Sequence, residues 1–246
     1  MSDVPEWVIY AVTRIRPTFT SEFNEPRTGT GTGFFLACGD FHALVTNRHV
    51  LDHSFATGSP GWRLSGLQVQ VRRALDHLRH QPEIEFIDAD LERSELVCSP
   101  EADVAAVGID FGTAREDLTF GDIELANVAD EAFLRERAKL MDIASFIGFP
   151  STARSGPWWD EAWNTPIARL ASLASPPGRP FVNRSIRTAD AGLVSGLSFT
   201  GSSGSPLFLH AKGQQNMTIG NAGYQPAKLI GIMSGHRPEV DSNAGS

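Results

Sequence analysis

Three short segments of this chain carry side chains that together could activate a nucleophile. Residues 201–206 read Gly-Ser-Ser-Gly-Ser-Pro, and such a turn can expose the hydroxyl of Ser203 while backbone N–H groups point to the same place. His49 lies far upstream in the segment Thr-Asn-Arg-His-Val, and Asp103 lies between the two. The order His, Asp, Ser along the chain is one of the known linear orders of a hydrolytic triad.

The chemistry of such a set is nucleophilic attack by a serine hydroxyl. A hydroxyl is a poor nucleophile near neutral pH, so a base must accept its proton during the attack. The imidazole of His49 would be that base, because imidazole changes its protonation state near neutral pH. A buried Asp103 would fix the tautomer of the imidazole and stabilise the imidazolium that forms.

Other interpretations of these residues are weaker. A Gly-Ser run alone is most often a flexible linker, but this one is flanked by Leu-Ser-Phe at 197–199 and by the apolar residues 207–209. Three other aspartates lie in the same region as Asp103: Asp88, Asp90 and Asp110. Asp103 is preferred because it opens an apolar strand, in which a carboxylate persists only when it is paired.

A metal site is not expected. His77 and His80 are three residues apart, as two ligands on one helix face can be. Arginines surround the pair, at positions 72, 73 and 79, so a solvated surface is the better interpretation.

Charge and hydropathy exclude several classes of partner. The 246 residues carry a net charge of −8 and a sequence pI of about 5.3, so the chain lacks the basic surface of a nucleic-acid-binding protein. No apolar run approaches the roughly 18 to 20 residues of a membrane span, and the acidic N-terminus shows no secretory signal. We therefore expect neither nucleic acid nor a membrane as a partner.

The cysteine content indicates a reducing compartment. The chain has two cysteines, Cys38 and Cys98, whereas a secreted enzyme of this size would usually carry several disulfides. We expect a cytoplasmic protein in which both residues are buried thiols. The sequence leaves open whether the two cysteines pair.

Many short segments have the pattern of β-strands. Apolar runs with Gly and Pro clustered between them predict strands at 7–15, 31–37, 41–46, 67–71, 83–87, 104–109, 141–147, 167–173, 181–187, 206–210 and 228–233. Residues 104–109 are continuously apolar, which predicts burial on both faces of that strand. Short strands at fairly regular spacing are typical of an all-β barrel or sandwich.

One helix stands out, at residues 130–140. Asp130 is a suitable N-cap, and Glu131 suits the first turn. We expect this helix to connect two β units, which divides the chain into residues 1–127, a connection at 128–140, and residues 141–246. His49 and Asp103 fall in the first unit and Ser203 in the second.

Six motifs occur in an order that resembles a known family. They are Gly-Thr-Gly-Phe-Phe at 31–35, Thr-Asn-Arg-His-Val at 46–50, Asp-Val-Ala at 103–105, Gly-Phe-Pro at 148–150, Gly-Ser-Ser-Gly-Ser-Pro at 201–206 and Gly-Ile-Met-Ser-Gly at 231–235. The chain resembles the bacterial trypsin-like serine peptidases of the chymotrypsin fold, and it looks closer to their disulfide-free, intracellular and HtrA-like branch than to digestive trypsin. The resemblance implies two six-stranded antiparallel Greek-key barrels, an active site in the cleft between them, and hydrolysis of peptide bonds without a metal or cofactor.

The resemblance also implies a role for each matching residue. His49 would be the general base, Asp103 its orienting carboxylate and Ser203 the nucleophile. The backbone N–H groups of Gly201 and Ser203 would form an oxyanion hole, in which one donor is worth roughly 3 to 4 kcal/mol. Ser234 matches the family serine that donates a hydrogen bond to the aspartate.

The chain departs from the family at three places. Ser202 stands where secreted members carry the aspartate that pairs with a freed N-terminus, so we expect no activation by N-terminal cleavage. Leu197, Gly235 and His236 fall near the primary specificity pocket, and because none of them is acidic we expect a pocket for small or apolar side chains. Residues 238–246 have no strand character. The second barrel is therefore expected to lack its last strand, unless another segment fills the gap.

The sequence thus predicts a serine endopeptidase that forms an acyl-enzyme with protein or peptide substrates. The alternative is a binding or scaffold module that keeps the protease fold without turnover. An α/β-hydrolase is disfavoured, because Pro206 would block the helix that must follow its nucleophile and because His49 precedes the serine. The substrate, the cleavage preference, the trigger and the oligomeric state stay open.

Overall fold

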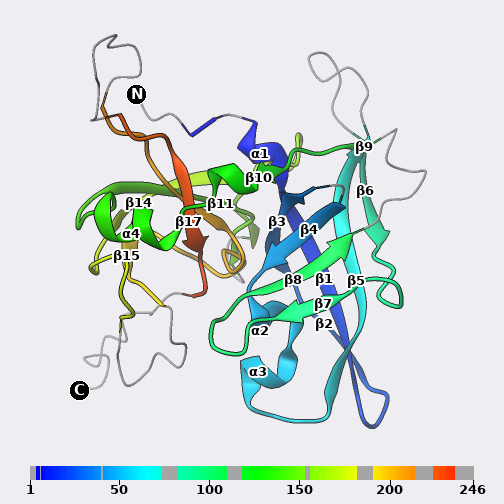
Figure 1. Cartoon of the computed structure of the whole chain (residues 1–246). Helices are drawn as coiled ribbons and strands as arrows, with labels where there is room; N and C mark the ends of the chain where they lie inside the picture. Colours follow the sequence, from blue (N-terminus) through cyan, green and yellow to red (C-terminus); the bar gives the residue numbers. More distant parts are fainter. Residues whose placement is uncertain are drawn as a thin grey trace, which may run out of the picture.

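A computed structural model describes residues 4–5, 7–39, 41–73, 83–109, 118–152, 156–181, 191–213 and 224–235. The strands form two main sheets that lie beside each other, one from the first half of the chain and one from the second (Figure 1). Apart from β10, which runs parallel to β3, the strand pairings within the described ranges are antiparallel. The predicted fold class, an all-β protein with two antiparallel units, is confirmed.

The first sheet contains ten described strands, and its main path runs β6-β5-β1-β3-β4-β8-β7. Three short strands pair beside that path, β2 with β1, β9 with β5 and β10 with β3. The bounds are β1 Val12–Ser21, β2 Pro26–Thr28, β3 Gly31–Cys38, β4 Phe41–Thr46, β5 Trp62–Arg73, β6 Glu83–Asp88, β7 Leu96–Cys98, β8 Ala105–Ile109, β9 Leu118–Thr119 and β10 Ile123–Glu124.

The second sheet has five described strands in the order β15-β14-β11-β16-β17, and β12 and β13 form a separate pair. The bounds are β11 Ile143–Gly148, β12 Ser151–Thr152, β13 Gly156–Pro157, β14 Ile167–Leu173, β15 Val194–Gly196, β16 Pro206–Leu209 and β17 Lys228–Ile232. Residues 238–246, where no strand is expected, lie outside the described residues.

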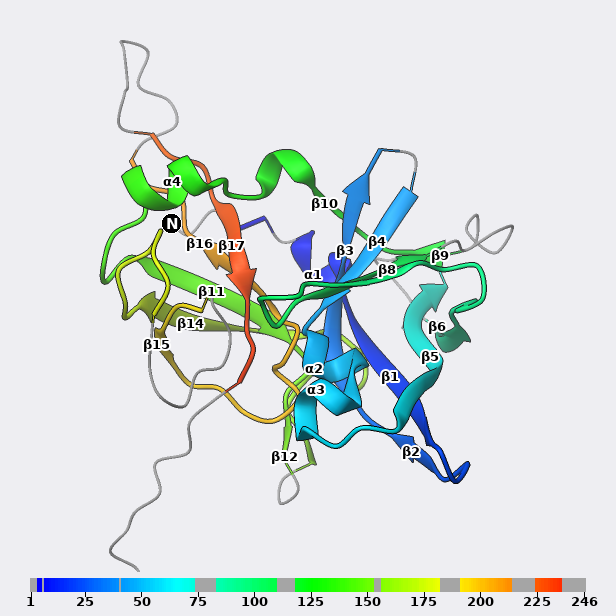
Figure 2. The same ribbon diagram turned by 60° about the horizontal axis from the view of Figure 1, so that its bottom comes forward.

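The helices are short. They are α1 Val8–Ala11, α2 Arg48–Leu51, α3 His53–Thr57, α4 Glu131–Glu136 and the 3₁₀ helix η2 Leu125–Asn127. Figure 2 shows α2 and α3 directly after β4, at one end of that strand. None of the described helices is both long enough and apolar enough to cross a membrane.

Several strands begin and end where the sequence predicts. β4 and β14 match the predicted ranges, and β3 is one residue longer than predicted. The predicted strand at 7–15 is wrong at its start, where the chain forms α1 before β1. A helical turn places Val8 and Ala11 on one face, and both are buried in the core between the sheets. The predicted strand at 181–187 lies almost wholly outside the described residues.

The predicted helix at 130–140 starts as expected and ends early. Asp130 is its N-cap, and Asp130 Oδ1 accepts a hydrogen bond from the Phe133 N–H at 2.7 Å. α4 ends at Glu136, because the next residues turn so that Ala138 is buried against Leu173.

Apolar side chains hold the two sheets together. One core fills the curled interior of the first sheet, and smaller clusters lie on the second. A further cluster joins the sheets and takes buried residues from both, among them Val12, Phe34 and Val45 from the first and Ile147, Phe149 and Phe208 from the second. Burial of apolar surface, worth roughly 25 cal/mol per Å², therefore fixes the sheets side by side.

The strand β8 is buried on one face rather than two. Ala105, Val107 and Ile109 are buried, while Ala106 and Gly108 are half-buried. The prediction of burial on both faces is wrong because the odd-numbered residues alone face the curled interior of an antiparallel sheet.

Both cysteines are free thiols in the structure. Cys38 ends β3 and Cys98 ends β7, and each is half-buried rather than fully buried as expected. Burial raises the pKa of the Cys98 thiol, so this thiol is protonated near neutral pH.

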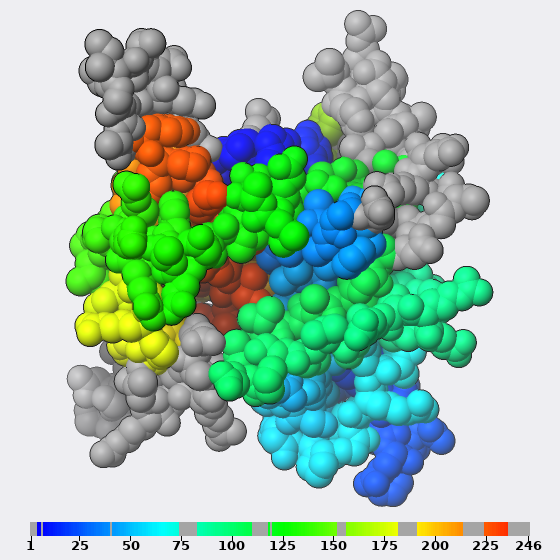
Figure 3. All heavy atoms as spheres, in the orientation of Figure 1, coloured from blue at the N-terminus to red at the C-terminus, as the bar shows by residue number. Residues whose placement is uncertain are grey.

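The segment that connects the two sheets, which contains β10, η2 and α4, contacts both of them. Figure 3 shows this segment, in green, lying beside the orange and red strand β17 and beside the blue strands of the first sheet. β10 pairs with β3, and the Ala129 N–H donates to Leu229 O at 2.8 Å. The division into units 1–127 and 141–246 stays a prediction.

Candidate active site

The site begins where β4 ends. Thr46 is the last residue of β4, Asn47 is extended, and α2 starts at Arg48, so His49 lies in the single turn of a short helix. The backbone N–H of His49 donates to Asp103 Oδ1 at 2.9 Å. This bond positions the histidine backbone relative to the carboxylate, while the imidazole is 27% exposed and can be reached from solvent.

Asp103 precedes β8 by two residues and is almost completely buried. Its carboxylate accepts hydrogen bonds from the His49 backbone, from His49 Nδ1 at 2.7 Å and from the hydroxyl of Ser234. Burial alone would raise the pKa of Asp103, but the bonds from His49 and Ser234 outweigh burial and hold this pKa below its ordinary value. Asp103 is therefore ionised at neutral pH. His49 Nδ1 donates to it, which leaves Nε2 of His49 to accept a proton.

Asn47 connects the histidine segment to the serine loop. This residue is completely buried. Its Nδ2 donates to Asp103 O at 2.8 Å, and its Oδ1 accepts a hydrogen bond from the Gly204 N–H at 2.6 Å. One amide side chain thus ties all three motifs together. Its role was not predicted from the sequence, where the available signal was a polar residue directly after the apolar strand at 41–46.

The serine loop turns sharply at two glycines. Gly201 and Gly204 have φ angles of 83° and 87°, in the left-handed region that favours glycine. A Cβ on Gly204 would lie 1.8 Å from Thr32 O, and a Cβ on Gly201 would lie 2.7 Å from Phe149 O. Glycine is therefore required at both positions, because of the backbone angle and because of the close approach.

Thr32 of β3 binds two carbonyl groups of this loop. Its hydroxyl donates to Gly201 O at 2.8 Å, and its backbone N–H donates to Ser203 O at 3.0 Å. Thr32 O in turn accepts from Thr46 Oγ1 at 2.7 Å. Because Thr32 is completely buried, these bonds fix the loop against the first sheet without competition from water.

Two backbone N–H groups of the loop remain without a protein acceptor. The C=O and N–H of one peptide unit point in opposite directions. Thr200 O accepts from the Ser151 N–H at 2.8 Å, and Ser202 O accepts from the Ser205 N–H at 3.0 Å. These bonds fix the peptide units that carry the N–H groups of Gly201 and Ser203. Within the described residues, neither of these two N–H groups has an acceptor, and both residues line one cavity. Free donors beside the nucleophile are one requirement of an oxyanion site.

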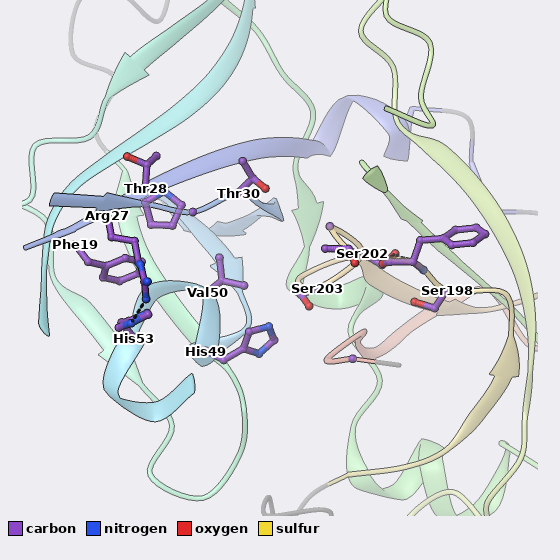
Figure 4. A pocket seen from close by; sticks show the side chains of 16 residues that line it. Phe19, Arg27, Thr28, Thr30, His49, Val50, His53, Ser198, Ser202 and Ser203 are labelled. Carbon is purple, nitrogen blue, oxygen red and sulfur yellow. Dashed lines mark hydrogen bonds between the residues drawn. The ribbon is translucent and has the colours of Figure 1, made fainter. Parts of the chain in front are cut away.

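His49 and Ser203 line the same open cavity, which has a volume of about 360 Å³. Figure 4 shows the two side chains facing each other across it, His49 from α2 and Ser203 from the loop before β16. No hydrogen bond joins these two described side chains. The structure therefore brings together His49, Asp103, Ser234, Ser203 and Gly201, the residues that the sequence singled out.

The three residues predicted for the specificity pocket do not all line the cavity. Gly235 lines the cavity, whereas Leu197 is 64% exposed and lies outside its lining. His236 lies outside the described residues, as do His77 and His80. The structure thus brings Gly235 alone of the three into contact with the cavity that holds Ser203.

Ser202 is bound within its own loop. The residue is buried, its hydroxyl donates to Phe199 O at 2.5 Å, and its backbone N–H donates to the same oxygen at 3.1 Å. A side chain satisfied in this way needs no distant charged group to order the loop.

Comparison with known proteins adds a weak structural similarity. The chain is similar to the crystal structure of Deg5, with a TM-score of 0.47 and 18% sequence identity, over 82% of this chain and 75% of that chain. No protein-family model and no curated protein sequence matches the chain. Similarity at this level carries no argument about function, so any assignment of chemistry depends on the geometry of the site itself.

Replacing Gly204 is expected to destabilise the fold strongly. Gly204→Ala forces a Cβ against Thr32 O at a positive φ, which should lower the free energy of unfolding by about 3 kcal/mol or more. Gly108→Ala in β8 is the matched control, because a Cβ there meets no atom within 4 Å, and its effect should stay within about 1 kcal/mol. Urea unfolding measures both, and equal effects of the two substitutions would contradict the argument.

Thr32→Val is expected to weaken both the fold and the site. The substitution removes a hydroxyl that donates to Gly201 O and accepts from the Phe149 N–H at 3.1 Å, so unfolding should become easier by about 2 kcal/mol. Without the bond to Gly201 O, the peptide unit between Gly201 and Ser202, which lies between the two free N–H groups, is held less firmly. Modification of Ser203 by a fluorophosphonate should therefore slow about tenfold. Thr13→Val is the control, because Thr13 also donates from a buried hydroxyl, to Gln70 O at 2.6 Å, but neither lines the cavity nor bonds to the serine loop. If both variants react at the same rate, Thr32 has no role in the site.

Asp103→Asn is expected to destabilise the protein more at pH 7 than in acid. Because the pKa of Asp103 is lowered in the fold, its carboxylate stabilises the protein fully above the ordinary pKa of 3.8, and this contribution is lost as the pH falls through the lowered value. Urea unfolding of the two proteins between pH 7 and pH 3 measures the difference. A difference that does not shrink toward pH 3 would rule out this linkage.

Proposed function

We propose that this chain is a trypsin-like serine endopeptidase that cleaves protein or peptide substrates through an acyl-enzyme. One observation carries the proposal: the His49 imidazole, bound by buried Asp103, faces Ser203 in a cavity where two backbone N–H groups have no acceptor. These groups supply a base, a nucleophile and an anion site.

In the first half of the reaction, Ser203 Oγ attacks the substrate carbonyl carbon and its proton passes to His49 Nε2. The imidazolium that forms is stabilised by Asp103 through the 2.7 Å bond to Nδ1. The negative oxygen of the tetrahedral intermediate binds the N–H groups of Gly201 and Ser203. His49 then gives its proton to the departing amine, the C–N bond breaks, and an ester on Ser203 remains.

In the second half, water replaces the amine. His49 Nε2 accepts a proton from the water as its oxygen attacks the ester carbon, and the same two N–H groups bind the second oxyanion. Collapse of this intermediate returns the proton to Ser203 Oγ and releases the carboxylic acid. No metal or cofactor enters either half of this scheme.

In this proposal the site is ready without N-terminal cleavage. Ser202 is bound by Phe199 of its own loop, and Thr32 binds the carbonyls of Gly201 and Ser203. The two β units, residues 1–127 and 141–246, form the walls of the cleft. On its cysteine content, the enzyme is proposed to act in the cytoplasm.

A catalytically silent binding module is the second candidate. The observation in its favour is that no hydrogen bond joins Ser203 to His49, both of which are described. Such bonds are often long before substrate is bound, so geometry alone does not separate the two candidates. Reactivity does separate them.

Labelling by a fluorophosphonate probe tests the proposal. The wild-type protein should react, with the label on the peptide that contains Ser203, because only an activated serine attacks the probe rapidly. Ser203→Ala should abolish labelling. Ser198→Ala is the matched control, since Ser198 lines the same cavity without a role in the scheme, and it should label like wild type. A folded wild-type protein that does not label would leave the silent module as the function.

A further inference from the structure

The cavity that holds Ser203 continues past His49 onto the first sheet. Phe19 of β1, Arg27 of β2 and His53 of α3 line this end of it, and Trp62, the first residue of β5, packs against Arg27 and His53. Figure 4 shows Phe19, Arg27 and His53 together on one side, with Val50 and His49 between them and Ser203. We call Phe19, Arg27, His53 and Trp62 the arginine cluster.

Contacts within the arginine cluster fix the direction of the guanidinium. Arg27 Nη1 lies 3.3 Å from His53 Nε2, and the guanidinium carbon lies 5.4 Å from the centre of the Trp62 ring. The His53 ring packs against Trp62 at 5.0 Å and against Phe19 at 5.4 Å, measured between ring centres. Because a guanidinium always donates, His53 Nε2 is the acceptor in this pair. The remaining N–H groups of Arg27 stay available to the cavity.

Arg27 forms no ion pair with a carboxylate of the described residues. The described residues that line the cavity include no Asp or Glu. Asp52, the acidic residue next to His53, is bound by Arg48 at 3.0 Å and caps α3. Arg27 therefore presents a positive charge that has no ion-pair partner among the described residues, and its guanidinium donors suit a carboxylate.

The reaction scheme places the arginine cluster on the leaving-group side of the cleaved bond. His49 accepts the proton of Ser203 and then gives it to the departing amine, so the leaving segment passes over the imidazole. The acyl segment remains attached to Ser203, on the other side of His49 from the arginine cluster. A substrate residue that contacts Arg27 therefore lies after the cleaved bond.

We propose that Arg27 binds an acidic side chain within the first three residues after the cleaved bond, so that the enzyme selects substrates with Glu or Asp there. This inference rests on the proposed function and names the substrate class of the same site. Phe19, which lines the cavity, contacts the methylene part of the side chain, and the guanidinium, against which Trp62 packs, binds its carboxylate. His53 acts through Arg27, whose direction it fixes, and is a positioning residue.

Matched peptides test the preference. Cleavage sites are first mapped by mass spectrometry in a mixed peptide library, and the best-cleaved sequence is then made as amidated peptides with Glu, Gln or Lys at each of the three positions. Wild type should cleave one Glu peptide about three- to tenfold faster than its Gln counterpart in kcat/KM, the range expected for a partly exposed charge pair. Arg27→Gln should remove this ratio, and Arg27→Glu should reverse it in favour of Lys.

The controls separate this inference from the proposed function. Arg63→Gln changes an exposed arginine of β5 outside the cavity and should keep the Glu preference. Fluorophosphonate labelling of Arg27→Gln should equal that of wild type, since Arg27 takes no part in activating Ser203. A wild-type enzyme that labels and cleaves with equal rates on Glu and Gln peptides overturns the inference while the proposed function stands. The same peptides are also made with a free C-terminal carboxylate. Faster cleavage that depends on this carboxylate and not on Glu overturns the inference, because the ligand is then a chain end and not an acidic side chain.

Discussion

The backbone at residue 204 lies directly against the backbone at residue 32, with no room for a side chain between them. The orientation of Ser203 depends on this close contact between the two backbone segments. The Gly204 N–H is shared by Asn47 Oδ1 and Met233 O, so one atom joins the histidine segment of the first sheet to the strand end that carries Ser234. A side chain at position 204 would push apart the groups that the proposed chemistry needs within hydrogen-bond distance.

Because this hydrogen-bond network is buried, the loss of any one of its bonds is costly. Thr32 and Asn47 are completely buried and Asp103 nearly so, which means that a bond broken inside the network is not replaced by water. The ionised Asp103 persists in this environment because His49 and Ser234 both donate to it. The same bonds that keep the charge tolerable in the interior also set the tautomer of His49, so stability and the proposed activity depend on one set of contacts.

Local patterns predicted the strands and the short motifs, and long-range contacts escaped prediction. β4 and β14 follow from apolar runs bounded by turn residues, and His49, Asp103 and Ser203 follow from their motifs. The role of Thr32 depends on partners about 170 residues away along the chain, and no periodicity encodes such a pairing. α1 was missed because a single buried helical turn and a strand end place similar apolar residues in sequence. The arginine cluster was missed because its four members come from four separate elements.

Apolar burial and hydrogen bonds both join the sheets, but they contribute differently. The apolar cluster that includes Phe34, Phe149 and Phe208 supplies most of the attraction but little direction, since hydrophobic burial depends on area rather than angle. The hydrogen bonds of Thr32 and Asn47 supply direction, because they weaken steeply when their geometry changes. The first sheet carries His49, Asp103 and the arginine cluster, while the second carries Ser203. A small sliding of one sheet over the other would therefore keep the core buried but separate base from nucleophile, and the buried bonds at the serine loop are what prevents that sliding.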